Sequence, residues 1–334
     1  MRPLTRLHYP VELCACRYEC ATEFTKLLAA ASGWDVIGFP TDSGDVKGAC
    51  IINALAPDCY ALFHTQNQYF WINGKRNPDW CVFAVAHPCS EPGELKFRHN
   101  QSIANHRLLG GFQLSEPLTH YRVNPNTIGM CLIIKRSTVD YYLAAPEVLP
   151  LKQHMDAFNA VQLSPAGYQW LSSYLWFASL APQQLRGTRH PIVPLLQHMS
   201  DGIYPPANKV VLPSTEVMLS GIHKVRSLAL AGGNVNELCA EMGLKRTQLN
   251  EACREAWDLT PKELLSRIRV EQAAFLFKHP DERLRLSLYS IEDVSELLKY
   301  TRPSVMRSHV KSWFGKTPSQ IWSDTNSMQL AMLI

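Results

Sequence analysis

The hydrophobic positions in the last third of the chain follow a helical period, and one arrangement of apolar and polar residues occurs there twice. Apolar residues recur at spacings of three and four, as on the buried face of an amphipathic helix. An offset of 56 residues aligns Leu238 with Val294, and an offset of 57 aligns Leu249 with Met306. The change of one residue falls where a turn is expected, so the apolar register survives it. The pattern therefore indicates a duplicated helical unit.

Each copy ends in an aromatic residue that is soon followed by a Thr-Pro pair. Trp257 precedes Thr260-Pro261, and Phe314 precedes Thr317-Pro318. Threonine is a good helix N-cap, and proline is favoured at the first helical position. A new helix is therefore expected to begin after each copy.

Local signals divide the first copy into two helices. Asn234 is expected to cap a helix over 235–242, which Gly243 ends because glycine tolerates a positive φ. A second helix is expected over about 245–256, with Leu249, Cys253 and Ala256 on its inner side.

The second copy is expected to follow the same plan. Ser290 caps a helix over 291–298, and Pro303 begins a helix that runs through Trp313. A long amphipathic helix over about 261–278 connects the copies. A short helix, a turn and a second helix form the unit that places its second helix in a DNA major groove.

With these features, residues 219–322 resemble the AraC-type transcription regulators. The resemblance is carried by residues 238–244 and 249–254 in the first copy, and by 291–295, Lys311 and 314–318 in the second. It implies two helix-turn-helix subdomains joined by a long helix. It also implies binding to double-stranded promoter DNA and activation through contact with RNA polymerase, with repression as the open alternative.

Three residues depart from the family pattern. Lys299 stands at the usual turn glycine, where a non-glycine residue costs on the order of 1 kcal/mol. Glu251 and Ser308 stand where many members carry Arg or Gln. The second subdomain is therefore expected to contact the DNA backbone more than the bases.

The residues expected to contact DNA lie on the outward faces of the two second helices. Arginine suits phosphate or guanine, and Gln or Asn can pair with adenine. The set is Lys245, Arg246, Thr247, Gln248, Asn250, Glu251 and Arg254 in the first copy, and Arg302, Ser304, Arg307, Ser308 and Lys311 in the second.

Charge is consistent with a specific rather than a general DNA-binding protein. The chain has 334 residues and a net charge of +4, from 33 basic and 29 acidic side chains. Residues 219–322 hold 16 Lys and Arg against 12 Asp and Glu, a surplus of four that equals the surplus of the chain. Without a membrane-spanning stretch or a signal-peptide core, the protein is expected in the cytoplasm, associated with the nucleoid.

The N-terminal part is expected to be rich in β-structure, which gives an α+β protein with a barrel-like sensor domain that also carries helices. Short β-prone runs occupy 51–52, 59–64, 68–72, 80–86, 107–114 and 130–135. Asn73-Gly74 predicts a hairpin turn. In the family this half is often a cupin-like barrel that senses an effector.

A catalytic cupin needs a compact set of metal ligands, whereas His87, His99, His106 and His120 are scattered. We therefore expect no enzyme activity, no cofactor and no metal. Aromatic side chains are the candidates for lining an effector pocket, with plain core packing as the alternative. They are Tyr60, Phe63, Tyr69, Trp71, Trp80 and Phe83.

Ten cysteines in a cytoplasmic protein are expected to be reduced thiols. Cys14, Cys16 and Cys20 are clustered, and His8 is the nearest candidate for a fourth metal ligand. The spacing matches no standard zinc motif, and cysteine is also a common small buried residue. A metal or redox role of this cluster stays open at this point.

The expected domain order is a sensor over 1–150, a helical segment over 151–204, a linker over 205–214, the DNA-binding domain over 215–322 and a tail over 323–334. In the helical segment, Leu171, Leu175 and Ala178 form an apolar stripe that either makes a homodimer or covers the β-domain.

Together these features predict a sequence-specific transcription regulator, dimeric and responsive to a small-molecule effector. One alternative is an interaction protein with a degenerate helix-turn-helix domain. A second is a barrel enzyme with a DNA-binding tail, which would require a metal or nucleophile constellation.

Overall fold

The computed structural model describes residues 14–87, 95–97, 102–104, 107–113, 118–123, 125, 128–185, 188–204 and 212–324. The chain divides into two compact units. Unit 1 comprises Met1–Tyr18, Lys26–Val36 and Gly48–Val210, and unit 2 comprises Glu19–Thr25, Ile37–Lys47 and Val211–Ile334. Two short N-terminal segments thus belong to the C-terminal unit. Most of the predicted linker, 205–211, and the tail beyond 324 lie outside the described residues.

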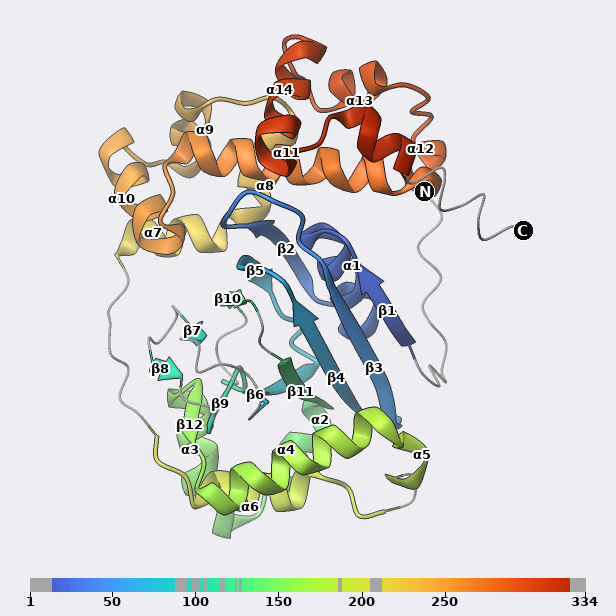
Figure 1. The fold of residues 1–334 in the computed structure, drawn as a ribbon. Coiled ribbons are helices and arrows are strands. Elements are labelled where there is room, and N and C mark those ends of the chain that lie inside the picture. Colours follow the sequence, from blue (N-terminus) through green and yellow to red (C-terminus); the bar gives the residue numbers. More distant parts are fainter. Residues whose placement is uncertain are drawn as a thin grey trace, which may run out of the picture. The chain divides into compact units, whose positions relative to one another are not determined.

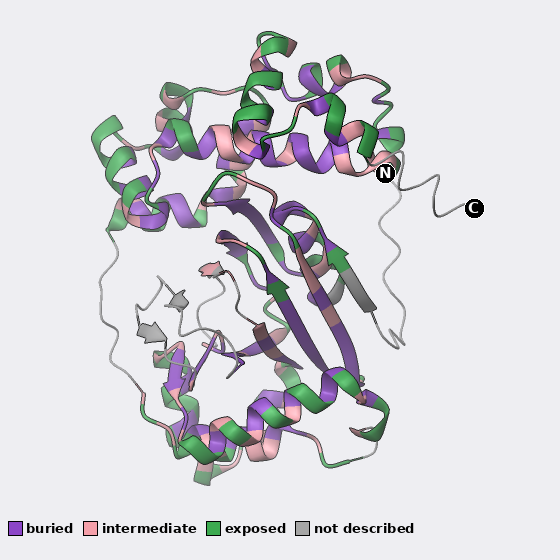
Figure 2. Cartoon of the chain, viewed as in Figure 1, coloured by how far each residue is buried: buried purple, intermediate pink, exposed green. Residues whose placement is uncertain are grey.

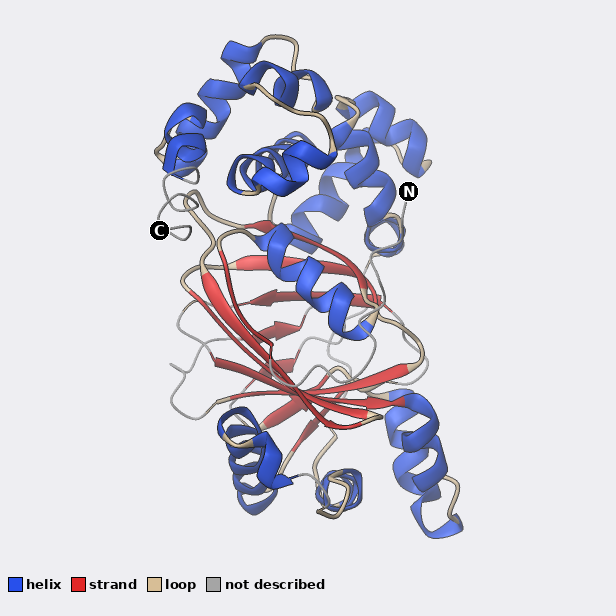
Figure 3. Ribbon diagram, turned by 90° about the vertical axis from the view of Figure 1, so that its right-hand side faces the viewer, coloured by secondary structure: helices blue, strands red, loops and turns tan. Residues whose placement is uncertain are grey.

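The strands form two antiparallel sheets (Figures 1 and 3). In the described residues they do not close into a barrel, so the α+β class is confirmed and the barrel-like form is corrected to two sheets. The first sheet has the order β1 (Cys14–Tyr18), β3 (Gly48–Ala56), β4 (Cys59–Gln66), β11 (Ile128–Lys135), β6 (Trp80–Ala86), β9 (Leu108–Gly110), β12 (Ala160–Gln162). The second has the order β2 (Asp35–Pro40), β5 (Phe70–Lys75), β10 (Leu118–Val123), β7 (Leu95–Phe97), β8 (Ser102–Ala104).

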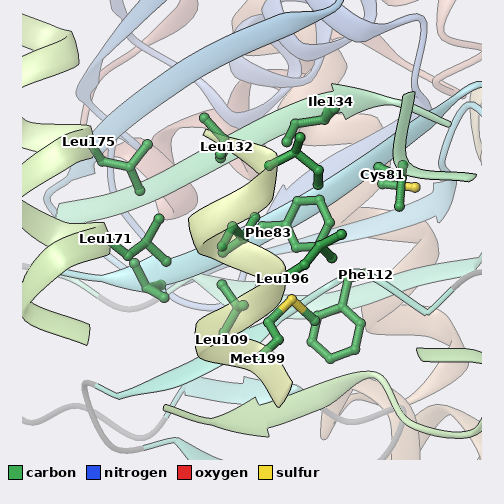
Figure 4. Close-up of a cluster of buried hydrophobic side chains, with 14 of the residues drawn as sticks. Cys81, Phe83, Leu109, Phe112, Leu132, Ile134, Leu171, Leu175, Leu196 and Met199 are labelled. Carbon is green, nitrogen blue, oxygen red and sulfur yellow. The ribbon is translucent and has the colours of Figure 1, made fainter. Parts of the chain in front are cut away.

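The main core of unit 1 lies between the first sheet and its covering helices. Leu171 and Leu175 of α4 (Pro165–Leu180) and Met199 of α6 (Ile192–Ser200) pack with Phe83 and Leu132 of the strands (Figure 4). All five side chains are fully buried. The apolar stripe of α4 therefore packs against the sheet. The remaining helices of this region are α2 (Arg136–Tyr142), the short 3-10 helix η1 (Pro146–Val148), α3 (Leu149–Ala157) and α5 (Pro182–Leu185). Helix α1 (Ala21–Ser32) belongs to unit 2 up to Thr25 and to unit 1 from Lys26.

The predicted hairpin turn at Asn73-Gly74 is wrong. Both residues lie inside β5, where Asn73 pairs with His120 of β10 and Gly74 pairs with Thr119. Asn73 is fully buried, and its Oδ1 lies 2.5 Å from Nδ1 of His120. Gly74 keeps the positive φ that suggested a turn, at 142°. A cross-strand polar pair therefore accommodates a dipeptide that is otherwise typical of turns.

Unit 2 is largely helical and contains two helix-turn-helix pairs with α11 between them (Figure 1). The first pair is α9 with α10, and the second is α13 with α14. Its helices are α7 (Pro213–Ser220), α8 (Ile222–Leu230), α9 (Val235–Met242), α10 (Arg246–Trp257), α11 (Pro261–Lys278), α12 (Pro280–Arg285), α13 (Ile291–Leu297) and α14 (Pro303–Phe314). None of the helices in the described part of the chain has the length and apolar character of a membrane span.

The predicted helix ends of unit 2 are confirmed by their hydrogen bonds. Asn234 Oδ1 accepts from the backbone N–H of Asn236 and Glu237, and Gly243 adopts a left-handed φ of 65°. Thr260 caps α11, with Pro261 at the first helical position. The backbone N–H of Gln320 donates to Thr317 Oγ1 at 3.3 Å, which starts the helical segment 318–324. The twin Thr-Pro signals therefore act alike.

Ser290 gives the first stability prediction. Its Oγ accepts from the backbone N–H of Asp293 at 3.0 Å, and Asp293 Oδ2 accepts from the N–H of Ser290 at 2.8 Å, which forms a capping box. Ser290→Ala removes the side-chain half of this box and should lower the free energy of unfolding by about 1 kcal/mol. Urea denaturation followed by circular dichroism measures this. Ser227→Ala, at an exposed position within α8, should leave stability nearly unchanged, and equal effects of the two would contradict the prediction.

The N-terminal segments of unit 2 pack on α10 and α11. Phe39 meets Trp257 edge-to-face, with ring centroids 6.2 Å apart. Arg267 donates to the carbonyls of Pro40 and Thr41. Glu271 Oε1 accepts from the backbone N–H of Thr22 at 3.0 Å, at the beginning of α1. These contacts join residues that lie more than 200 positions apart in the sequence.

Candidate nucleic-acid interface

The two helix-turn-helix pairs bury equivalent side chains. Leu238 and its counterpart Val294 are both 0% exposed. The same holds for Leu249 with Met306 and for Cys253 with Val310, while Trp257 and Phe314 are 1% and 8% exposed. The sequence alignment of the two copies therefore corresponds to one packing scheme used twice.

The outward faces of α10 and α14 are open to solvent in unit 2. Figure 2 shows exposed residues alternating with buried ones along both helices. The twelve residues predicted to contact DNA are all exposed, from Lys245 to Arg254 in the first copy and from Arg302 to Lys311 in the second. The buried Leu249 and Cys253, like Met306 and Val310, are four positions apart and mark the inward face of each helix, while Lys245, Arg246 and Arg302 are exposed where the helices begin.

Three of these side chains already have partners within the protein. Gln248 Oε1 accepts from the backbone N–H of Lys245 at 3.0 Å and so helps to cap α10. A guanidinium nitrogen of Arg254 donates to the carbonyl of Asp258 at 3.3 Å. Arg307 forms an ion pair with Glu292 of α13. DNA would have to displace these contacts, so each of the three side chains would contribute less to the free energy of DNA binding.

Lys299 occupies the turn between α13 and α14 in a left-handed conformation, with φ at 54°. Gly243 occupies the equivalent turn of the first copy, with φ at 65°. The turn therefore has the same backbone form in both copies, and the departure at Lys299 leaves the second helix-turn-helix intact.

A cleft of about 460 Å³ lies between the two helix-turn-helix pairs, beside α11. It was not anticipated from the sequence, because its walls come from four separate elements. Its basic lining residues are Arg246 from α10, Lys262 and Arg269 from α11, and His309 from α14, and no carboxylate lines it. The cleft therefore suits an anion. The remaining lining residues are Gly233, Asn234, Val235, Asn236, Leu265, Ser266 and Tyr300.

The electrostatics of this cleft follow from its cations. The pKa of His309 is lowered by partial burial and by the positive charges of Arg269 and Lys262. Arg269 is held in place by hydrogen bonds to the carbonyls of Ala229 at 2.8 Å and Gly233 at 3.4 Å. Its guanidinium carbon lies 5.3 Å from the centroid of the Tyr300 ring. A fixed guanidinium contributes positive potential without needing to reorganise.

The aromatic residues proposed as an effector pocket occupy three places in unit 1. Phe63 and Phe83 belong to the core under α4 and α6. Tyr60 contacts Trp80 at a centroid distance of 5.1 Å. On the second sheet, the guanidinium of Arg122 lies 4.6 Å from the ring centroid of Tyr69 and 5.9 Å from that of Trp71.

Histidines and cysteines are placed in part. His87 packs against Trp176, and His120 stacks on Trp71. His8, His99 and His106 lie outside the described residues, as do the side chains of Cys14 and Cys16. Cys20 is buried in unit 2, near Glu23 and His279.

Comparison with known proteins agrees with the helix-turn-helix geometry. The family model described as a helix-turn-helix domain matches residues 238–322. The structure of ToxT from Vibrio cholerae is similar over 93% of this chain and 98% of that chain, at 11% identity and a TM-score of 0.31. Unsaturated fatty acid-bound wild-type ToxT from Vibrio cholerae is similar over 94% of this chain and 95% of its own, at 10% identity and a TM-score of 0.31.

The xylose-binding transcription activator XylR is similar over 43% of this chain and 39% of its own, at 16% identity and a TM-score of 0.29. No curated protein matches the chain. These structural similarities are weak, whereas the family model covers α10 to α14 and so both second helices of the helix-turn-helix pairs. Residues 238–322 form a helix-turn-helix domain of the AraC type, and the chain is a DNA-binding transcription regulator.

Proposed function

We propose that the protein binds specific promoter sequences by placing α10 and α14 in successive major grooves of one duplex. This proposal is supported by two features of unit 2. Both helices expose their predicted contact residues, and one basic cleft lies between them. When two reading helices enter neighbouring grooves of one duplex, the DNA backbone between those grooves passes the region between the helices. The basic lining of the cleft suits that backbone.

Within this proposal, Arg246 and Lys262 bind a backbone phosphate at the mouth of the cleft, since both are exposed and line it. Asn250 and Gln248 lie on the exposed face of α10 and read bases, with adenine as the preferred partner of an amide. Gln248 must release its cap contact to Lys245 in order to pair. Asn250 is therefore the better candidate for the strongest base contact.

The second helix-turn-helix contributes backbone contacts more than base readout. Ser304 and Ser308 offer short hydroxyls that suit phosphate oxygens. Arg307 is engaged by Glu292 before DNA arrives. Lys311 is exposed near the end of α14.

The regulatory part of the proposal assigns effector sensing to unit 1 and dimerisation to α4. Arg122 beside Tyr69 and Trp71 offers a cation next to aromatic rings, a setting suited to a small organic anion. Trp176, Phe177 and Leu180 of α4 are 42%, 40% and 67% exposed. A second copy of the chain would cover these three side chains, and two copies would present paired reading heads to paired half-sites. Activation through RNA polymerase completes this proposal.

Selection of bound fragments from genomic DNA tests the function directly. Purified full-length protein should enrich a small set of promoter fragments that share a motif with two half-sites. Selection with and without cell extract should show whether an effector changes that set, because a ligand acts only if it favours one arrangement over another. Recovery of random fragments, or of none, in both conditions would instead favour an interaction protein with a degenerate helix-turn-helix domain.

His309 provides a pH test of the cleft. Because its pKa is lowered in the free protein, His309 is neutral at pH 7, and a phosphate in the cleft should raise that pKa. Binding is then coupled to proton uptake, so affinity should rise as the pH falls below about 6.5. We expect the increase in DNA affinity at low pH to be about threefold smaller for His309→Gln than for the parent protein. Fluorescence anisotropy at constant ionic strength measures both affinities. An identical pH profile for both proteins would place the phosphates elsewhere.

A further inference from the structure

Four side chains with metal-binding chemistry gather in unit 2, where the Glu19–Thr25 segment meets the last turns of α11. One ligand atom each from Cys20, Glu23 and His279 lie within 4.8 Å of one another. Nε2 of His279 is 3.5 Å from Oε2 of Glu23. The buried Glu271 carboxylate neighbours the Cys20 thiol. Cys20 directly precedes α1 and Glu23 lies in its first turn, while Glu271 belongs to α11 and His279 is the C-cap residue of that helix.

Two of these side chains have buried polar atoms with no hydrogen-bond partner. Glu271 is 1% exposed, and its Oε1 accepts from the N–H of Thr22 while its Oε2 has no partner. Nε2 of His279 is also buried and makes no hydrogen bond. Leaving such an atom unpaired is unfavourable, because it loses its hydrogen bonds to water without a replacement. A metal ion in this cluster would give the His279 nitrogen a partner and would offset the charge of the Glu271 carboxylate beside Cys20.

The cluster also has more acidic groups than the nearby cations balance. Burial, followed by the neighbouring Glu271 carboxylate, raises the pKa of the Cys20 thiol. Lys278 is the nearest cation, but its Nζ donates to Asp45 Oδ1 at 2.8 Å and to the carbonyl of Glu19 at 2.6 Å. A divalent cation would therefore be held by charge as well as by coordination.

We propose that Cys20, Glu23 and His279 bind one divalent transition-metal ion of the zinc class, with Glu271 as the fourth ligand. Thiolate, imidazole and carboxylate are the ligands that zinc prefers, and four of them complete a tetrahedron. Bond lengths of about 2.0–2.3 Å place the ligand atoms roughly 3.3–3.8 Å apart, so the side chains must close by about 1 Å. Glu23 and His279 are 23% and 27% exposed and have room to rotate. Binding releases the thiol proton of Cys20 to solvent.

Such an ion would join the first turn of α1 to the end of the helix that connects the two DNA-reading subdomains. Cys20 and His279 are far apart in the sequence but belong to the same compact unit. The ion would hold the N-terminal segment on that unit through bonds that depend on metal supply. This site is separate from the proposed DNA interface, because none of its residues lies on α10, on α14 or in the cleft.

The test uses full-length protein stripped with a chelator and titrated with Zn²⁺ and, separately, with Co²⁺. We expect one ion per chain after desalting, a thiolate-to-cobalt charge-transfer band, and a higher thermal midpoint with metal. Cys20→Ser should abolish the charge-transfer band and weaken Zn²⁺ binding at least about 100-fold. His279→Gln should weaken Zn²⁺ binding by a similar factor. Cys239→Ser, which alters a cysteine of α9 outside the cluster, should bind like the parent protein.

Two results would overturn the proposal. The first is less than one tenth of an equivalent of Zn²⁺ on the parent protein, and the second is an unchanged cobalt spectrum in Cys20→Ser. If Cys20→Ser fails to fold, as judged by circular dichroism, the parent cobalt spectrum and the His279→Gln affinity still decide the matter. Absence of the thiolate band in the folded parent protein would leave only a Glu23–His279 ion pair at this place.

Discussion

Replacement of Arg246 by glutamate is expected to weaken DNA binding by about 30-fold on specific and non-specific sequences alike. Arg246 begins α10, is exposed and lines the basic cleft, so it lies at the position where a groove-bound helix meets the backbone. A charge-assisted hydrogen bond to phosphate contributes about 2 kcal/mol, which corresponds to roughly 30-fold in affinity. The dependence of affinity on salt should also become shallower, since fewer counterions are released. Anisotropy titrations at several salt concentrations measure both effects.

Arg285→Glu is the matched control for that prediction. It changes net charge by the same amount at an exposed position of α12, outside the cleft and the two reading helices. Its effect on affinity should therefore be small. If both charge reversals weaken binding equally, the effect reflects net charge and Arg246 makes no specific phosphate contact.

Replacement of Trp257 by alanine is expected to cost unit 2 about 4 kcal/mol of stability, because truncation of a buried aromatic side chain leaves a cavity. Trp257 is 1% exposed, ends α10 and meets Phe39 edge-to-face. A loss of this size is a large share of the stability of a typical domain. DNA binding should fall with it, since α10 loses its anchor. Urea denaturation followed by far-ultraviolet circular dichroism, together with a DNA titration at low temperature, measures both.

Trp176→Ala serves as its comparison. The side chain is 42% exposed on α4, so its removal creates a much smaller cavity and should cost much less. DNA affinity should then be preserved at protein concentrations high enough to keep the proposed dimer intact. Equal midpoints for Trp257→Ala and the parent protein would show that the aromatic end of α10 carries little packing energy.

Local signals predicted the helices of the C-terminal region well because helix ends are determined over a few residues. Asn234, Thr260 and Ser290 each cap a helix through a residue at most three positions away, so the chemistry is visible in the sequence. The buried face of each helix also follows from spacing, and all the predicted DNA contacts are exposed. Whether each of them touches DNA stays a prediction.

Short β-strands were less predictable because their pairing depends on distant partners. Asn73-Gly74 has the composition of a turn, yet its environment is set by His120, far along the chain. Likewise, the six aromatic residues proposed as one pocket have similar sequence surroundings but lie in three places, since strand alternation and sheet membership separate them.

The sequence by itself determined the duplicated helix-turn-helix, its caps and its reading faces, since a duplication appears as a repeat along the chain, and caps and faces depend on residues within about one or two helical turns of each other. Only the tertiary structure decided that Glu19–Thr25 and Ile37–Lys47 join the C-terminal unit, that one basic cleft spans both copies, and that Cys20 meets His279. Such contacts join segments that are far apart in the sequence, so they produce no recognisable periodicity or residue spacing in it. They become visible only when packing brings those segments together.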